Sequence, residues 1–514
     1  MVDATTGEAI RRAVVRADYR GAGGAVSTDA EGRFEIRDLP AGRYTVMASK
    51  AGYVAGIYGQ TDYRTPGTPI EIGDGQIIER IRIPISPGGV ITGHLSDDFG
   101  DPVAEATVTA LEYRTIAGRR RLMPAGGSRS MTDDQGSFRI YGLSPGEYYL
   151  SATSRMGNLV YSSTMRNETE GAAPTYYPGT ADIGQAQRVV VKASQETAGI
   201  NFGLVIARMS TLRGRALDSS GRPAARAMAM LVPRDPGTAV LMMSSSNLVR
   251  PDGTFEVANV PPGAYTLMIR PMGQTATNPE FGSLAVTVGY EDLDGLVVTM
   301  GVGATARGRV VTDEGTPPPF PARQVRIYFA NPEPGLTMVA PQRPDIRDDF
   351  TFEVGGLSGT LLVRASADGA NEWGVKEVLL DGVDVTDSAV DFTGRREVTG
   401  FEIVLTRRRT EISGTLTDER GRPVLDAMIL VFSPDPDKWG PLSRYRSMAR
   451  PDQSGRFVVT GLPPASDYRM VAVQNMDPGE AMDPEFLETI RDQGIRITLS
   501  EGEQKVQNLT LRQP

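Results

Sequence analysis

The stretch TDDQGSFRIYGLSPGEYYLSA, from Thr132 to Ala152, has three close relatives elsewhere in the chain. They read TDAEGRFEIRDLPAGRYTVMA, RPDGTFEVANVPPGAYTLMI and DQSGRFVVTGLPPASDYRMVA. In each copy a tight turn precedes a short alternating strand, and a second turn leads into another alternating strand. Self-similarity of this kind is typical of a repeated folding unit, so it constrains the fold more than any single motif does.

Alignment on this stretch divides the 514 residues into five units. Units two to five begin with a strand and a Gly-centred turn, as in VITGHLSDDFGDPV and EISGTLTDERGRPV, and all five end with an alternating strand. Short strands of period two between Gly, Pro and Asp turns predict an all-β fold of five tandem Ig-like or prealbumin-like β-sandwiches. Because the links are short, we expect a semi-rigid rod. The predicted domains are 1–86, 87–205, 206–303, 304–409 (a degenerate repeat) and 410–514.

The alternation assigns a structural role to the repeated residues. Gly136 permits a positive φ in the turn, and Phe138 and Ile140 then point to one face of the strand. The next strand directs Tyr148, Leu150 and Ala152 inward. The equivalent inward sets are Tyr44, Val46, Ala48; Tyr265, Leu267, Ile269; Leu361, Val363, Ala365; and Tyr468, Met470, Ala472. Outward positions vary, since Arg139 is matched by Glu35, Glu256 and Val458. The repeat is therefore interpreted as a packing signature and not as a recurrent active site.

The first unit lacks part of its opening strand. VDATTGEAIRRAVV aligns without a gap on LSDDFGDPVAEATV, but the segment equivalent to VITGH is missing. Three explanations are open: a fragment of a longer exported protein, a start placed inside the first domain, or a strand supplied by a neighbouring molecule. No spare strand is visible at either end to act as that donor.

Segments that interrupt the repeat predict loops and one helix. The insertions 115–130, 160–180 and 332–347 are expected to be surface loops. DPEFLETIRDQG, from Asp483 to Gly494, has an Asp cap, a Pro at the first helical position and a terminating Gly. It predicts a short helix that covers the last sandwich.

Composition excludes several classes of function. The chain has 54 basic and 63 acidic residues and a net charge of −9, which argues against nucleic-acid binding. It has no cysteine, so thiolate catalysis and Cys-ligated metals are excluded. His94 is the only histidine, and it occupies an ordinary strand position. We expect no membrane span, no catalytic residue, no cofactor and no metal; Ca²⁺ binding by turn carboxylates such as Asp133 is left open.

One set of residues in the second unit resembles the pattern of the carboxypeptidase regulatory-like domain: Gly93, Gly100-Asp101-Pro102, Ala106, Thr132-Asp133, Gly136, Phe138, Leu143, Pro145-Gly146 and Tyr148. The resemblance covers units one, two, three and five well and unit four loosely, as in exported multi-domain proteins of acidobacteria-like soil bacteria. It implies a transthyretin-like β-sandwich that is non-catalytic and accompanies enzymes, receptors or surface proteins.

Aromatic residues outside the repeat pattern are the candidates for ligand contact. TYYPG at 175–179 and YRTIAGRRRL at 113–122 are the best segments for stacking on sugar rings. The predicted glycan-stacking residues are Tyr176, Tyr177, Trp373 and Trp439.

Together these observations favour a non-catalytic extracellular or cell-surface protein, structural or adhesive, as in a filament or surface layer. Its partners would be further copies of itself, other cell-surface proteins or polysaccharide, and a signal peptide would have been truncated or removed. The alternative is a carbohydrate-binding accessory array, detached from or partnering an exported enzyme.

Overall fold

The computed structural model describes residues 1–511 except 20–21, 61, 64, 66, 117, 155–169, 235–245, 273–279, 333–343, 345, 369, 371, 441, 475 and 477–478. These residues form β-sheets throughout, and the described part of the chain has one short α-helix. They group into two compact units, of which one comprises 1–152, 175–204 and 410–514, and the other 153–174 and 205–409. The predicted all-β class of tandem β-sandwiches is confirmed, whereas the domain boundaries and the rod stay predictions.

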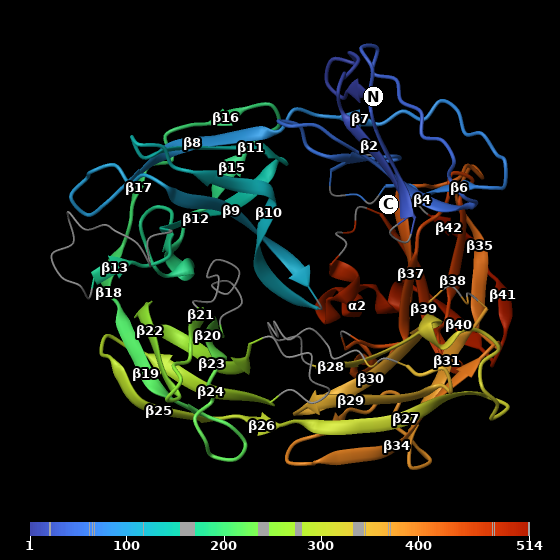
Figure 1. Cartoon of the computed structure of the whole chain (residues 1–514). Helices are drawn as coiled ribbons and strands as arrows, with labels where there is room; N and C mark the ends of the chain where they lie inside the picture. The colour runs from blue at the N-terminus through green and yellow to red at the C-terminus, as the bar shows by residue number, and fades with distance from the viewer. Residues whose placement is uncertain are drawn as a thin grey trace. The chain divides into compact units, whose positions relative to one another are not determined.

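The first unit contains three groups of strands, here called sandwiches 1, 2 and 5 (Figure 1). Sandwich 1 has β1 (Val2–Asp3), β2 (Val14–Tyr19), β3 (Ala22–Ser27), β4 (Gly42–Ser49), β5 (Gly56–Ile57), β6 (Ile70–Ile72) and β7 (Pro84–Ile85). Sandwich 2 has β8 (Gly89–Ser96), β9 (Ala106–Ile116), β10 (Arg119–Met131), β11 (Ser137–Leu143), β12 (Gly146–Ser154), β14 (Thr175–Tyr176), η2 (Ile183–Gln185), β15 (Val189–Val191), β16 (Glu196–Thr197) and β17 (Phe202–Gly203). Sandwich 5 has β35 (Glu411–Asp418), β36 (Ala427–Phe432), η4 (Pro436–Lys438), β37 (Arg446–Ala449), β38 (Arg456–Thr460), β39 (Ala465–Gln474), η5 (Glu480–Met482), α2 (Pro484–Ile490), η6 (Arg491–Gln493), β40 (Ile495–Leu499), β41 (Gln504–Val506) and β42 (Leu509–Leu511).

The second unit contains sandwiches 3 and 4 and the small ladder of β13 (Glu170–Ala172) with β18 (Ile206–Arg208). Sandwich 3 has β19 (Ser210–Leu217), β20 (Ala227–Pro233), β21 (Ser246–Leu248), β22 (Thr254–Val260), β23 (Gly263–Pro271), β24 (Glu280–Val288), β25 (Leu293–Thr299) and β26 (Gly301–Val302). Sandwich 4 has β27 (Ala304–Thr312), η3 (Ala322–Gln324), β28 (Val325–Ala330), β29 (Thr351–Leu357), β30 (Thr360–Ala367), β31 (Gly374–Leu380), β32 (Val383–Asp384), β33 (Val390–Asp391) and β34 (Glu397–Thr406).

Sandwiches 2 to 5 share one topology. The first strand of each sandwich lies at the centre of one sheet. It is antiparallel to the strand that follows the Gly-containing turn of the repeat, or its equivalent in sandwich 4, and parallel to a strand near the end of the sandwich. The sheet orders are β11-β8-β16, β22-β19-β25, β29-β27-β34 and β38-β35-β41. The opposing sheet is built around the strand that contains Tyr148, Tyr265, Leu361 or Tyr468, which is β12, β23, β30 or β39 respectively. The repeated sequence therefore supplies one strand to each sheet, and its inward side chains meet between them.

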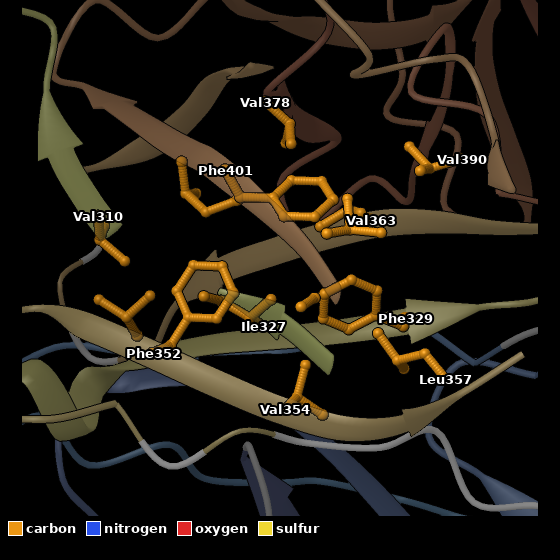
Figure 2. Close-up of a cluster of buried hydrophobic side chains, with 14 of the residues drawn as sticks. Val310, Ile327, Phe329, Phe352, Val354, Leu357, Val363, Val378, Val390 and Phe401 are labelled. Atoms are coloured by element: carbon orange, nitrogen blue, oxygen red, sulfur yellow. The ribbon is translucent and has the colours of Figure 1, made fainter. Parts of the chain in front are cut away.

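Burial follows the predicted alternation. Phe138, Ile140, Tyr148, Leu150 and Ala152 are all at most 3% exposed, and the equivalent residues of sandwich 3 are buried in the same way. In sandwich 4 the aromatic rings of Phe329 and Phe401 approach to 6.1 Å between the sheets, with Phe352 nearby (Figure 2). Each fully buried side chain of this size stabilises the fold by about 1.5–3 kcal/mol, so the alternation alone accounts for much of the core.

In sandwiches 1, 2, 3 and 5 the buried tyrosine of the repeat also closes the preceding turn. The Tyr265 hydroxyl donates to the Pro261 carbonyl at 2.9 Å. Tyr44, Tyr148 and Tyr468 make the same contact with Pro40, Ser144 and Pro463 at 2.7–2.8 Å. Burial raises the pKa of Tyr265 to about 12. A hydroxyl of this kind joins the start of a core strand to the turn before it, as the tyrosine corner does in Ig-like domains.

Sandwich 4 closes its turn without glycine. Phe350 occupies the position of Gly136 and takes φ +63°, where Gly136 has +72°. A non-glycine residue in this region is uncommon because its Cβ is crowded. Phe350 is 7% exposed and packs edge-to-face on Phe320 at 6.5 Å, so burial of its ring offsets the backbone strain.

The predicted helix is present. Helix α2 begins after Asp483, whose Oδ1 accepts a hydrogen bond from the Glu485 amide at 3.0 Å, and η6 continues it to Gln493. Its buried residues Leu487 and Ile490 pack with Phe432 and Trp439 in a second cluster of sandwich 5. The helix thus covers the outer face of a sheet, as expected.

The prediction of a surface loop at 115–130 is wrong. Strands β9 and β10 form a long hairpin in which Arg119 pairs with Ile116 and Met131 with Thr107, with a register shift between Pro124 and Arg129. The segment interrupts the repeat and so favoured a loop, but inserted residues can also extend a hairpin where an irregularity bends the ladder. Residues 160–169 and most of 332–347 lie outside the described residues. Residues 170–180 are described, and the loop expected there includes the short strands β13 and β14.

Substitution of Tyr265 by Phe should lower the stability of sandwich 3 by about 1 kcal/mol, because the hydroxyl bond to Pro261 is lost while the ring stays buried. Native-state amide exchange of β22 and β23 measures this change. Tyr290→Phe is the matched control, since Tyr290 is 65% exposed in the same sandwich. Equal exchange in the two variants would contradict a structural role for the hydroxyl.

Acid should destabilise the turns that Asp side chains close. Oδ1 of Asp218 and Asp418 accepts the amides of Arg222 and Arg422 at 2.9 and 2.8 Å, and these backbone bonds lower the pKa of both carboxyls. A folded-state pKa below the unfolded value adds stability that is present at neutral pH and lost as pH falls through the folded pKa. Urea unfolding from neutral pH to about pH 2 should show this loss. Asp218→Asn with Asp418→Asn keeps the amide acceptor, and should make the acid dependence shallower; an unchanged slope would refute the assignment.

Candidate functional site

Tyr176 and Tyr177 stand in a turn of sandwich 2 that packs against its core. Tyr176 is 3% exposed in β14, where its backbone pairs with Ser151. Tyr177 is half-buried and meets Phe202 edge-to-face at 5.9 Å. The pair therefore lies against the sandwich, and Tyr177 alone retains exposed surface.

The two tryptophans lie in different sandwiches. Trp439 is 3% exposed, and its Nε1 donates to the Ser433 carbonyl at 2.6 Å. Trp373 is half-buried in sandwich 4, with Phe320 at 5.7 Å and the Arg407 guanidinium 5.2 Å from its ring centre. The structure does not bring the four predicted aromatics together, and stacking on glycans stays a prediction for Tyr177 and Trp373, which have exposed surface.

A different aromatic pair lies beside two arginine side chains in sandwich 2. Tyr113 of β9 and Tyr149 of β12 meet edge-to-face at 5.7 Å, and Tyr113 is 40% exposed. The Arg120 guanidinium lies 4.5 Å from the Tyr113 ring centre, and that of Arg188 lies 5.9 Å from the Tyr149 ring centre. We call Tyr113, Tyr149, Arg120, Arg188 and Glu147 the aromatic–arginine patch.

Hydrogen bonds hold the polar side of this patch in place. Arg188 donates through Nε to the Tyr149 hydroxyl at 3.0 Å and through Nη1 to Glu147 at 2.7 Å. These two bonds raise the pKa of the Arg188 guanidinium. Aromatic rings beside fixed donors and a carboxylate match what a sugar ring needs, which is an apolar face and directional polar contacts.

Sequence reasoning reached Tyr113 as part of YRTIAGRRRL but missed Tyr149 and Arg188. Tyr149 follows the inward Tyr148, so its outward position was predictable from alternation. Tyr149 lies next to Tyr113 because β9 pairs with β12, and the sequence alone does not show that these two strands pair.

His94 lies exposed on β8, as expected from its strand position. Its backbone amide donates to Asn201 Oδ1 at 2.9 Å, and the Thr415 amide makes the same bond to Asn508 in sandwich 5. The Nδ1 atom lies 3.3 Å from both the Gln135 carbonyl and Ser137 Oγ. The hydrogen bond that recurs in sandwiches 2 and 5 uses the backbone amide and not the imidazole. This position therefore has a structural role.

Turn carboxylates accept hydrogen bonds from their own turns. Asp133 Oδ1 accepts the amides of Gln135 and Ser137 at 3.0 and 2.8 Å, and Asp452 does the same for Ser454 and Arg456. Within the described residues, no group of three or more His, Cys, Asp or Glu side chains is placed to hold a metal ion. The helices described in the structure include none that is long and apolar enough to cross a membrane.

Comparison with known proteins gives a family match for the first sandwich. Residues 1–72 match the model of the carboxypeptidase regulatory-like domain, which confirms the predicted resemblance for that segment. No curated protein matches the chain.

Solved structures to which the chain is similar include one bacterial protein named TIE and two bacterial pilins. The TIE protein of Bacillus anthracis covers 85% of this chain and 76% of its own at 11% identity and a TM-score of 0.18. A streptococcal ancillary pilin covers 59% of this chain and 99% of its own, at 12% identity and a TM-score of 0.18. The major pilin subunit of Bacillus cereus covers 59% of this chain and 99% of its own, at 10% identity and a TM-score of 0.15. At these scores the superpositions carry no argument about this chain.

Glycan binding should depend on the aromatic–arginine patch. Tyr149→Ala or Arg188→Ala is expected to weaken any polysaccharide that the chain binds by about tenfold, because each removes a stacking ring or a fixed donor. Tyr141→Ala is the matched control, since Tyr141 is 49% exposed on the other sheet of sandwich 2. A glycan array followed by titration measures the effect, and Tyr177→Ala tests the second aromatic. Loss of binding with Tyr141→Ala and not with Tyr149→Ala would exclude the patch.

Proposed function

We propose that the chain is a non-catalytic extracellular or cell-surface protein with a structural or adhesive role, such as a component of a filament or surface layer. The observation that supports it most is the use of the repeated residues. In every sandwich they pack the core, close a turn or pair strands, and the outward positions differ from copy to copy.

The variation is clearest at one outward position. Arg139 lies beside Tyr141, Glu35 pairs with Arg37 at 2.9 Å, and Glu256 lies 3.9 Å from Arg213. The residue at this position contacts a different partner in each of the three copies. A catalytic mechanism shared by the copies would require the same set of side chains in each, whereas a folding module does not. An enzymatic role is therefore not part of the proposal. The match of residues 1–72 to a regulatory-like accessory domain supports the same conclusion.

A carbohydrate-binding accessory array is the second candidate. The aromatic–arginine patch favours it, because a Tyr pair with ordered Arg and Glu side chains occurs in sandwich 2 alone among the contacts described. In this function the chain would bind polysaccharide beside a partner enzyme. Its partners as a structural protein would be further copies of itself or other surface proteins.

Electron microscopy of native material tests the proposal directly. We expect immunolabelled chains at the cell surface with regular contacts between neighbours. Protease treatment of intact cells should remove the label, and cells lacking the protein are the control. A hydrolase turnover that a point mutation in one sandwich abolished would overturn the non-catalytic proposal.

A further inference from the structure

The long hairpin of sandwich 2 is a basic segment in an acidic chain. Strands β9 and β10 pair from Thr107 with Met131 to Ile116 with Arg119. Residues 106–131 hold five arginines and one glutamate, whereas the whole chain has a net charge of −9. Like charges gathered on one element attract ions of opposite sign, even where the net charge of the protein is negative. The hairpin therefore favours an anionic ligand.

Three neighbouring strands place the aromatic–arginine patch on one face of their sheet, in the order β10-β9-β12. Tyr113 of β9 stands opposite Leu122, two places from Arg120 of β10, so alternation puts the Tyr113 and Arg120 side chains on the same side. Tyr149 of β12 meets Tyr113 on that side. Arg188 comes directly before β15, which pairs with β12. Arg120 therefore contacts one tyrosine of the pair and Arg188 the other.

Arg120 is the guanidinium of the patch that has no carboxylate partner. It is exposed and lies over the Tyr113 ring, 4.5 Å from the ring centre. Within the part of the chain that the structure describes, its side chain makes no ion pair or hydrogen bond. A guanidinium placed over an aromatic ring keeps the N–H donors at its edge, where a carboxylate can accept two parallel hydrogen bonds. Arg120 can therefore bind the carboxylate of a ligand.

The other side of the patch has the opposite requirement. Arg188 already donates to Glu147 and to the Tyr149 hydroxyl. The Glu147 side chain is 56% exposed, and its carboxylate repels a second anion but accepts hydrogen bonds from hydroxyl groups. The Tyr149 hydroxyl accepts from Arg188 and retains its own proton to donate. This side of the patch fits uncharged hydroxyl groups.

We propose that the aromatic–arginine patch binds an acidic polysaccharide whose sugar units carry a carboxylate, that is, a polymer of uronic acid. The carboxylate of one unit binds Arg120, and sugar hydroxyls bind Glu147 and Tyr149. Tyr113, which is 40% exposed, supplies apolar contact for the C–H face of a sugar ring. A run of acidic amino acids supplies carboxylates but no hydroxyl groups, so it satisfies only the Arg120 side. The inference rests on the proposed carbohydrate-binding function and names its ligand class.

Two uronic acid polymers, polygalacturonate and alginate, test the proposal on the full chain. Each is compared by isothermal titration calorimetry with its esterified form, which has the same sugar backbone without the negative charge. We expect at least one acidic polymer to bind at least about tenfold more tightly than its ester, because only the carboxylate form pairs with Arg120. Added salt should reduce this difference, since the groups involved are exposed.

Variants of one arginine supply the second arm. Arg120→Gln should lower the affinity for the acidic polymer to about that for the ester, and Arg120→Lys should retain part of the difference because it keeps the charge but not the two parallel bonds. Arg139→Gln is the matched control, since Arg139 is exposed 5.6 Å from the Tyr141 ring centre in the other sheet of sandwich 2. It should leave binding unchanged. The comparison of acid with ester on the unaltered chain keeps the test decisive if a variant disturbs folding.

Three results would overturn the proposal: equal binding of acid and ester, full affinity in Arg120→Gln, or poly-L-glutamate bound as tightly as the acidic polysaccharide. Equal binding of acid and ester that Tyr149→Ala abolished would remove the ligand class alone and leave carbohydrate binding standing. Absence of binding to any polysaccharide would remove both. The surface location measured by microscopy is independent of all these results.

Discussion

The pairing of the first strand of each sandwich with two distant segments is the constraint on which the other features depend. Strand β8 joins β11, more than forty residues later, and β16 with β17, about a hundred residues later. The approach is so close that only a glycine fits where the Phe138 ring crosses the strand. Because these contacts are non-local, the intervening chain loses conformational entropy when they form. Burial of the core side chains between the two sheets has to offset that entropic cost. The repeated Phe, Tyr and turn residues make that closure possible.

Two side-chain hydrogen bonds, each a polar device that fixes one turn, stabilise the two strands of the repeat where they begin. The tyrosine hydroxyl fixes the turn that precedes the opposing sheet, and the Asp carboxylate fixes the turn that precedes the Phe-containing strand. Both satisfy backbone groups that a tight turn leaves without partners. Sandwich 4 keeps the Asp carboxylate, since Asp349 Oδ1 accepts the Thr351 amide at 3.0 Å, but it shows that the tyrosine is not indispensable. Leu361 replaces the tyrosine and Phe350 the turn glycine, and a cluster that includes Phe320, Phe329, Phe392 and Phe401 provides the core.

Alternation predicted which residues lie inside, because one period governs both strands of the repeat. The inward sets of Tyr148 and Tyr265 were correct at every position, and the Asp483 cap and the following Pro located the helix. Pattern did not predict which outward residues meet. Tyr113 and Tyr149 come together through the register of two strands that are far apart in sequence. The burial of Trp439 depends likewise on a helix that packs against it from a later part of the chain.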